Sequence, residues 1–201
     1  MPGSIKIDDG SGNYTILTNA GSLGSDKTLT IPNETATLAT TNGITSTDLW
    51  HLTTNYTGDA QPITSNLARY TNDGVGYIGT GMTESSGVFT FPSTGIWRIV
   101  FTAVRFAQDS YDIRRLGADI STTTNNSTYG VAARSQGTIV DNAQTGDSFY
   151  TNYTYFDFDV TDTSTHKVRF ETFSTNTGRD NVLGTSDRIE TAMSFTRLGD
   201  T

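Results

Sequence analysis

One run of residues near the middle of the chain limits its fold more than any other. Gly87–Phe91 is a short β-type segment, the turn Pro92–Gly95 follows, and Ile96–Phe106 is a long β-type segment. Successive side chains of a strand point to opposite faces, and here both faces are apolar: Ile96, Val100, Val104 and Phe106 on one, Trp97, Ile99, Phe101 and Ala103 on the other. An antiparallel sheet usually leaves one face to solvent, so this strand needs a second cover.

A second predicted strand has the same property. In Phe149–Val160 one face carries Phe156 and Phe158, and the opposite face carries Tyr153 and Tyr155. By contrast, Lys167–Phe173 is apolar on one face only. Two explanations stay open: a thicker sandwich or a loop folded over the outer face, or an aromatic-rich interface between copies of the chain. We favour the interface, and hence an obligate oligomer.

The composition predicts an all-β fold. Only 34% of the residues are hydrophobic and 17% are charged, while Thr, a good strand former, makes up about a fifth of the chain. No window has convincing helical periodicity. Closely spaced strands separated by Gly, Asn, Asp and Ser are typical of a sandwich or jelly roll. The predicted strands are Trp50–Thr53, Ile63–Tyr70, Gly76–Ile78, Gly87–Phe91, Ile96–Phe106, Asp112–Ser121, Gly130–Ala133, Phe149–Val160, Lys167–Phe173 and Thr191–Leu198.

The sequence divides into two parts, residues 1–47 and 48–201. The first part has no Phe or Trp and a single Tyr, Tyr14. Its short alternating runs are Ser4–Ile7, Tyr14–Leu17, Thr28–Ile31 and Thr37–Ala39. A segment so short and poor in apolar residues does not bury enough area to fold alone. We expect a β-rich segment that is stabilised by a partner surface or by its own copies.

Charge and chemistry exclude several classes of function. The net charge of −8 and a pI near 4.5 argue against nucleic-acid binding. The chain has no cysteine, no apolar run of membrane-spanning length and no recognisable secretion signal. It also lacks a Gly-x-Ser-x-Gly elbow and a phosphate-binding loop. We therefore expect a non-enzymatic protein made in a cytoplasm, with no catalytic, cofactor-binding or metal residues and no membrane partner.

Three features nevertheless have a functional alternative. The first is metal binding by His51 and His166, which we disfavour because neither has the nearby carboxylates of a metal site. Asp157, Asp159 and Asp162 have a spacing suited to Ca²⁺, but a solvated strand face that discourages edge pairing is the interpretation we favour. The loop Thr122–Tyr129 has residues suited to sugar contacts, and we favour a solvated loop tip there too.

Residues 48–201 resemble the C1q/tumour-necrosis-factor jelly-roll superfamily. Gly87–Trp97 has the cadence of Gly, aromatic, Thr, Pro, a short turn with Gly, and an aromatic strand, and Ala192–Leu198 resembles the family's closing strand. The resemblance implies a compact homotrimer in which inner-sheet aromatics meet near the three-fold axis. It further implies Tyr153 and Tyr155, together with Trp97 and Phe101, as trimer-interface residues.

The N-terminal part resembles a segment of small bacteriophage virion proteins. Thr28–Pro32 followed by Thr37–Thr41 matches its pattern of apolar-Pro, short turn and Gly-Thr-Leu-Ala-Thr, although Ala36 replaces the usual Gly. The resemblance implies a virion anchor, and its candidate residues are Leu29, Ile31, Pro32 and Leu38.

Together these features predict a homotrimeric virion protein that is assembled in the host cytoplasm. Its N-terminal segment would attach to the major capsid protein or a tail component, and its jelly-roll knob would face outward as a capsid decoration (cement) protein or short head fibre. The alternative is a tail-fibre or receptor-binding protein that recognises host-surface carbohydrate.

Overall fold

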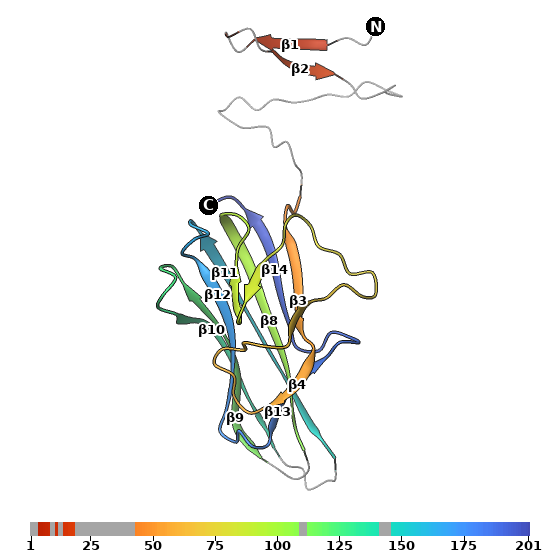
Figure 1. The fold of residues 1–201 in the computed structure, drawn as a ribbon, viewed down its shortest axis with the longest axis vertical. Helices are drawn as coiled ribbons and strands as arrows, with labels where there is room; N and C mark the ends of the chain where they lie inside the picture. Colours follow the sequence, from red (N-terminus) through yellow and green to blue (C-terminus); the bar gives the residue numbers. More distant parts are fainter. Residues whose placement is uncertain (1–3, 9–10, 12–13, 19–42, 109–111, 141–145) are drawn as a thin grey trace. The chain divides into compact units, whose positions relative to one another are not determined.

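The computed structural model describes the chain apart from residues 1–3, 9–10, 12–13, 19–42, 109–111 and 141–145 (Figure 1). Contacts divide the chain into two units, Met1–Thr40 and Thr41–Thr201. In the first unit, β1 (Ser4–Asp8) and β2 (Tyr14–Thr18) form an antiparallel hairpin. These strands match two of the four runs predicted there, and the other two lie outside the described residues, as do Leu29, Ile31, Pro32 and Leu38.

The second unit is built from two antiparallel sheets. The seven-stranded sheet has the order β4 (Thr54–Thr57), β13 (Asp180–Thr185), β8 (Gly95–Ala107), β14 (Ala192–Gly199), β3 (Thr47–Leu52), β5 (Leu67–Arg69), and β11 (Ser148–Val160) also pairs with β8. The five-stranded sheet has the order β10 (Gly130–Ile139), β9 (Ile113–Thr123), β12 (Lys167–Ser174), β7 (Val88–Thr90), β6 (Thr83–Ser85). The described residues are thus all-β, as predicted, and they include no helix that has the length and apolar character to cross a membrane.

The core lies between the two sheets and is rich in aromatic rings. On β8 the odd-numbered side chains point inward, and Trp97, Ile99 and Phe101 are completely buried. Rings from both sheets meet there, with the centroids of Phe101 and Phe170 5.0 Å apart. This burial removes the largest apolar side chains from water and supplies the main favourable term in folding.

Most of the long predicted strands form, but the prediction of a strand over Ile63–Tyr70 was wrong for residues 63–66, since only Leu67–Arg69 (β5) is a strand there. Several short strands were missed or misplaced. β4, β6 and β13 were not predicted; β13 lies where its neighbours β4 and β8 hold it in register. The prediction was wrong for Gly76–Ile78, where only an isolated bridge joins Ile78 to Thr47. The expected boundary between residues 47 and 48 falls inside β3, and the backbone of Ser46 already accepts a hydrogen bond from Arg197.

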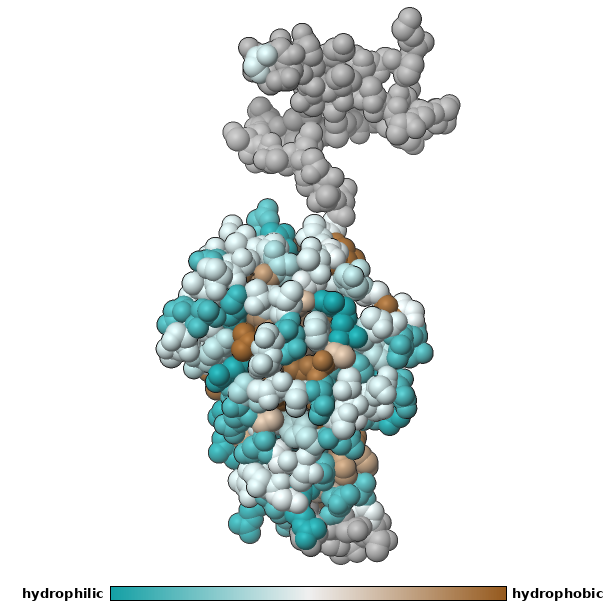
Figure 2. All heavy atoms as spheres, in the orientation of Figure 1, coloured by the Kyte–Doolittle hydropathy of each residue, from teal (hydrophilic) through white to brown (hydrophobic). Residues whose placement is uncertain are grey.

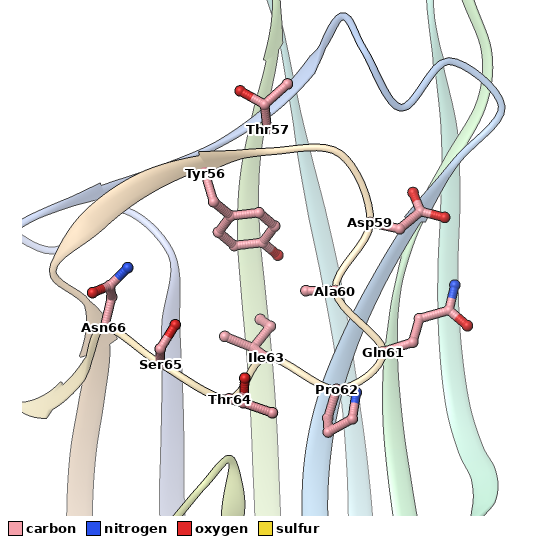
Figure 3. A pocket seen from close by; sticks show the side chains of 10 residues that line it. All are labelled: Tyr56, Thr57, Asp59, Ala60, Gln61, Pro62, Ile63, Thr64, Ser65 and Asn66. Carbon is pink, nitrogen blue, oxygen red and sulfur yellow. The ribbon is translucent and has the colours of Figure 1, made fainter.

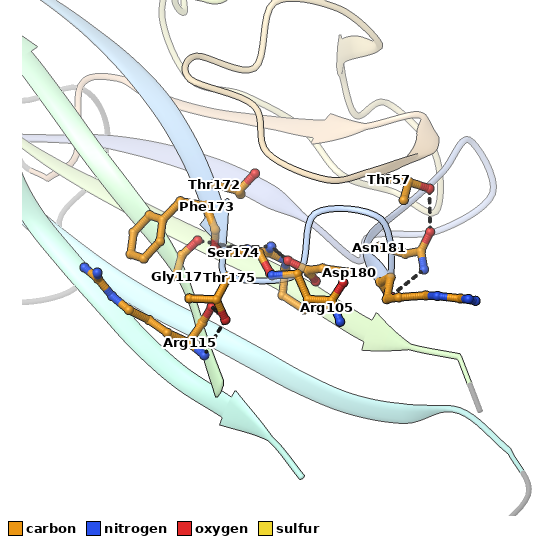
Figure 4. A network of polar contacts seen from close by, with 12 residues as sticks. Thr57, Arg105, Arg115, Gly117, Thr172, Phe173, Ser174, Thr175, Asp180 and Asn181 are labelled. Carbon is orange, nitrogen blue, oxygen red and sulfur yellow. Dashed lines mark hydrogen bonds and ion pairs between the residues drawn. The ribbon is translucent and has the colours of Figure 1, made fainter. Parts of the chain in front are cut away.

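A buried ion pair lies within the seven-stranded sheet, and its arginine is also bonded to the five-stranded sheet (Figure 4). The side chains of Arg105 and Asp180 are both completely buried. The guanidinium of Arg105 donates to Asp180 and to the backbone oxygen of Gly117 on β9, at 2.8 Å. Burial lowers the pKa of Arg105 to about 10, so the guanidinium is still charged at neutral pH.

We expect Arg105→Ala to lower the free energy of unfolding by about 3–5 kcal/mol, because Asp180 is then left buried without its counter-charge. Urea titration followed by the fluorescence of the buried Trp50 and Trp97 measures the change. Arg188→Ala, which breaks an exposed pair with Glu190, is the control and should cost at most about 1 kcal/mol. Arg105→Met combined with Asp180→Leu should recover most of the loss. A loss below about 1 kcal/mol for Arg105→Ala alone would contradict this role.

Candidate functional site on the outer face of the seven-stranded sheet

The outer face of the seven-stranded sheet brings together side chains from β8 and β11. The antiparallel register places Tyr153 opposite Thr102 and Tyr155 opposite Val100. The odd-numbered residues of β11 therefore share a face with the even-numbered residues of β8, on the side away from the core. The same register places Ser194 of β14 next to Val100.

Aromatic side chains on this face are exposed in the single subunit. Phe149, Tyr153 and Tyr155 have exposed fractions of 61%, 59% and 57%. They follow β11 at intervals of two or four residues, beside the half-buried Val100 and Val104 of β8. No described segment covers the two tyrosines, so the described residues give no support to a thicker sandwich or an overlying loop. An exposed row of large apolar side chains is typical of an interaction surface.

A charged pair is placed among these aromatic rings. Arg98 donates two hydrogen bonds to Asp157, at 2.9 and 2.8 Å, and its guanidinium lies 5.7 Å from the ring centroid of Tyr155. Hydrogen bonding to Arg98 lowers the pKa of Asp157, so the pair stays ionised at neutral pH. Arg98, Tyr153 and Tyr155 line a hollow of about 150 Å³. The face thus combines a flat aromatic surface with the bidentate Arg98–Asp157 pair, whose fixed geometry is suited to orienting a partner.

The structure corrects two of the four predicted interface residues. Trp97 and Phe101 are completely buried inside the sandwich, so a neighbouring subunit has no access to them. Tyr153 and Tyr155 do lie on an exposed face, and their role in an interface stays a prediction. The sequence reasoning also missed Phe149 and Arg98. For Phe149 the signal was available, because it has the same parity in β11 as the two exposed tyrosines. The outward placement of Arg98 depends on how β8 pairs with β11, and the sequence carries no signal for it.

Four of the five candidate metal residues have other partners. Asp157 is held by Arg98, and Asp162 accepts hydrogen bonds from the backbone and hydroxyl of Ser164. Among the residues that the structure describes, no group of three acidic or histidine side chains is placed to hold a metal ion. His51 is buried against Tyr70, with ring centroids 4.9 Å apart, and burial lowers its pKa. His166 is buried beside Phe158. Both histidines therefore act as packing groups here.

The loop Thr122–Tyr129 uses much of its own hydrogen-bonding capacity. The side-chain oxygen of Asn125 accepts from the backbone of Ser127 and Thr128 and from the hydroxyl of Thr123. The ring of Tyr129 lies 4.2 Å from the guanidinium of Arg169. These contacts fix the loop by local turn chemistry, and fewer of its groups are left for a sugar.

Comparison with solved structures identifies the architecture as a tumour-necrosis-factor-like jelly roll. No family model matches the sequence, and no curated protein is similar to it. Murine APRIL at pH 5.0 superimposes with a TM-score of 0.54 at 10% identity, over 76% of this chain and 98% of that chain. Eiger TNF from S. frugiperda superimposes with a TM-score of 0.53 at 10% identity, over 77% of this chain and 93% of that chain. The jelly-roll fold predicted from Gly87–Trp97 and Ala192–Leu198 is confirmed, and at this identity the likeness establishes the fold alone.

We expect Tyr153→Ala and Tyr155→Ala to weaken self-association much more than they weaken the subunit. Both side chains are more than half exposed, so their loss should change subunit stability by no more than about 0.5 kcal/mol. Central aromatic residues of an interface contribute about 2 kcal/mol or more. Light scattering over a dilution series measures the mass, and Tyr77→Ala, another exposed tyrosine, is the matched control. An unchanged mass in both β11 variants would rule out this choice of interface.

Proposed function

We propose that this protein is a non-enzymatic structural protein of a bacteriophage virion, a homotrimer whose jelly-roll units associate through the outer face of the seven-stranded sheet. The observation that carries the proposal is the exposed row of Phe149, Tyr153 and Tyr155 on a sandwich whose own core is already complete. Three subunits that turn this face toward a common axis remove the row from water, and rotational closure prevents further growth. The trimeric state itself follows from the resemblance to the C1q/tumour-necrosis-factor superfamily.

A structural role agrees better with the described hollows than catalysis does. Among the described residues, hollows are formed around Tyr56, between Ser46 and Arg197, and at Arg98 with Tyr153 and Tyr155. None of these three hollows is lined by two carboxylates or by a nucleophile with a histidine. Glycoside hydrolysis needs two facing carboxyl groups, and acyl transfer needs a nucleophile and a base within hydrogen-bond reach. The proposal therefore assigns binding and assembly to the chain.

The N-terminal unit supplies the attachment in this proposal. Its contacts separate it from the sandwich at Thr40, and it contains the hairpin β1–β2. The virion-like motif with Leu29, Ile31, Pro32 and Leu38 belongs to this unit by sequence. Three linked anchors on one trimer bind one assembly with avidity, so each anchor need only bind weakly. In this proposal the trimer is a capsid decoration protein or a short head fibre, with the major capsid protein as the partner.

Co-sedimentation with phage particles tests the attachment. We expect the full chain to sediment with particles, and Ile31→Asp combined with Leu38→Asp to abolish this without changing the trimer mass, because buried charge is costly at an apolar contact. Ser22→Asp combined with Ser25→Asp adds the same charge at polar positions of the same unit and should still sediment. Gold-labelled antibody should decorate the head. Particles without label, or double-Asp variants at Ile31 and Leu38 that sediment normally, would refute the proposed anchor.

A further inference from the structure

A hollow of about 410 Å³ lies in the segment that connects β4 to β5, away from the residues assigned to self-association. The ring of Tyr56 points into the loop toward Ile63 and the methyl group of Ala60 (Figure 3). Asp59 and Gln61 lie along one side, with Ser65 and Asn66 on the other. Ile63 is only 3% exposed, so the apolar surface open to a ligand comes from the half-buried Tyr56 and Ala60. With polar groups around its edge, the hollow has the usual composition of a small-ligand site. The surrounding surface is mostly hydrophilic with separate apolar patches (Figure 2).

The loop is fixed to the sandwich along its length. Gly58 donates to the backbone oxygen of Asp180 at 2.7 Å, and Ile63 donates to that of Phe170 at 2.9 Å. Ala60 and Thr172 exchange two backbone hydrogen bonds, at 3.1 and 2.8 Å.

The side chain of Tyr56 is fixed as well. Its hydroxyl lies 2.5 Å from that of Thr172, and burial raises the pKa of Tyr56 to about 12, so the phenol stays neutral. The hollow is therefore preformed, and a ligand would not have to order it.

The polar side chains at the edge have unused hydrogen-bonding capacity. Within the described part of the chain, no hydrogen bond engages the side chains of Asp59, Gln61, Thr64, Ser65 or Asn66. This differs from the loop Thr122–Tyr129, where Asn125 and Thr123 are already bonded. A carboxylate and two amides can accept from and donate to neighbouring hydroxyl groups. Such a set matches a ligand with several hydroxyls at its edge.

We propose that this hollow binds a neutral carbohydrate. A sugar ring has an apolar C–H face, which packs on the half-buried Tyr56 and Ala60, and hydroxyls at its edge, which reach Asp59 and Gln61 on one side and Ser65 and Asn66 on the other. The lining residues carry a negative charge at Asp59 and no positive charge, and the chain has a net charge of −8. Sulfated and sialylated glycans are therefore disfavoured. The site adds recognition of a surface glycan to the structural role and uses different residues.

The experiment applies the full chain to an array of neutral, sulfated and sialylated glycans, and each hit is then titrated by calorimetry. We expect neutral hits whose affinity falls at least about tenfold in the double variant Asp59→Ala/Gln61→Ala. Both positions are outside the core, so the fold and the trimer mass should be unchanged. Raising the salt to about 0.5 M should leave the affinity within about twofold, because the ligand carries no charge to screen.

The matched control is Ser127→Ala/Thr128→Ala in the other polar loop, which should bind like the unmodified chain. A blank array, hits confined to acidic glycans, or affinity lost only in the Ser127/Thr128 variant would each overturn the site. Co-sedimentation of Asp59→Ala/Gln61→Ala with phage particles separates this inference from the proposed virion role, since a failed sugar site leaves attachment intact.

Discussion

The pleat of β8 is the constraint on which the rest of the structure depends. Because its side chains alternate and its neighbours β11, β13 and β14 fix its register, Trp97 and Phe101 fill the core while Val100 and Val104 are forced outward. The odd-numbered side chains of β8 fill the core. The apolar even-numbered side chains are not needed there and, with Tyr153 and Tyr155, form a surface on the outer face of the sheet.

Two ion pairs on the same strand illustrate what burial does to charge. Arg105 is on the face of β8 that points into the core, and it is completely buried with Asp180 while bonding to both sheets. Arg98 is on the outer face of β8, and its pair with Asp157 remains partly exposed among tyrosine rings. The buried pair fixes the packing of the sheets, since an uncompensated charge there is costly. The exposed pair adds little to the fold and is available to orient a partner.

The two proposed functions use separate parts of the sandwich. Self-association uses β8 and β11, whereas the hollow at Tyr56 belongs to a connection that β12 and β13 hold in place. A change at Asp59 or Gln61 therefore need not disturb the trimer. A trimer also presents three copies of the hollow, and weak individual sugar contacts add to useful avidity when they are linked.

The sequence by itself determined the fold class and most long strands, because alternation over eight or more residues, as in β8, β11 and β12, leaves few other options. It did not determine β4, β6 and β13, which are short and form through their neighbours' registers. It also identified Tyr153 and Tyr155 as a face distinct from that of Phe156 and Phe158, but not which face of β8 joins them. Only the tertiary structure shows that the face of β8 with Trp97 and Phe101 is the buried one. The face that packs on the second sheet depends on pairing between segments that are distant in the sequence. The hollow at Tyr56 likewise required the fold, since its apolar centre and polar edge come together only when the loop bonds to β12 and β13.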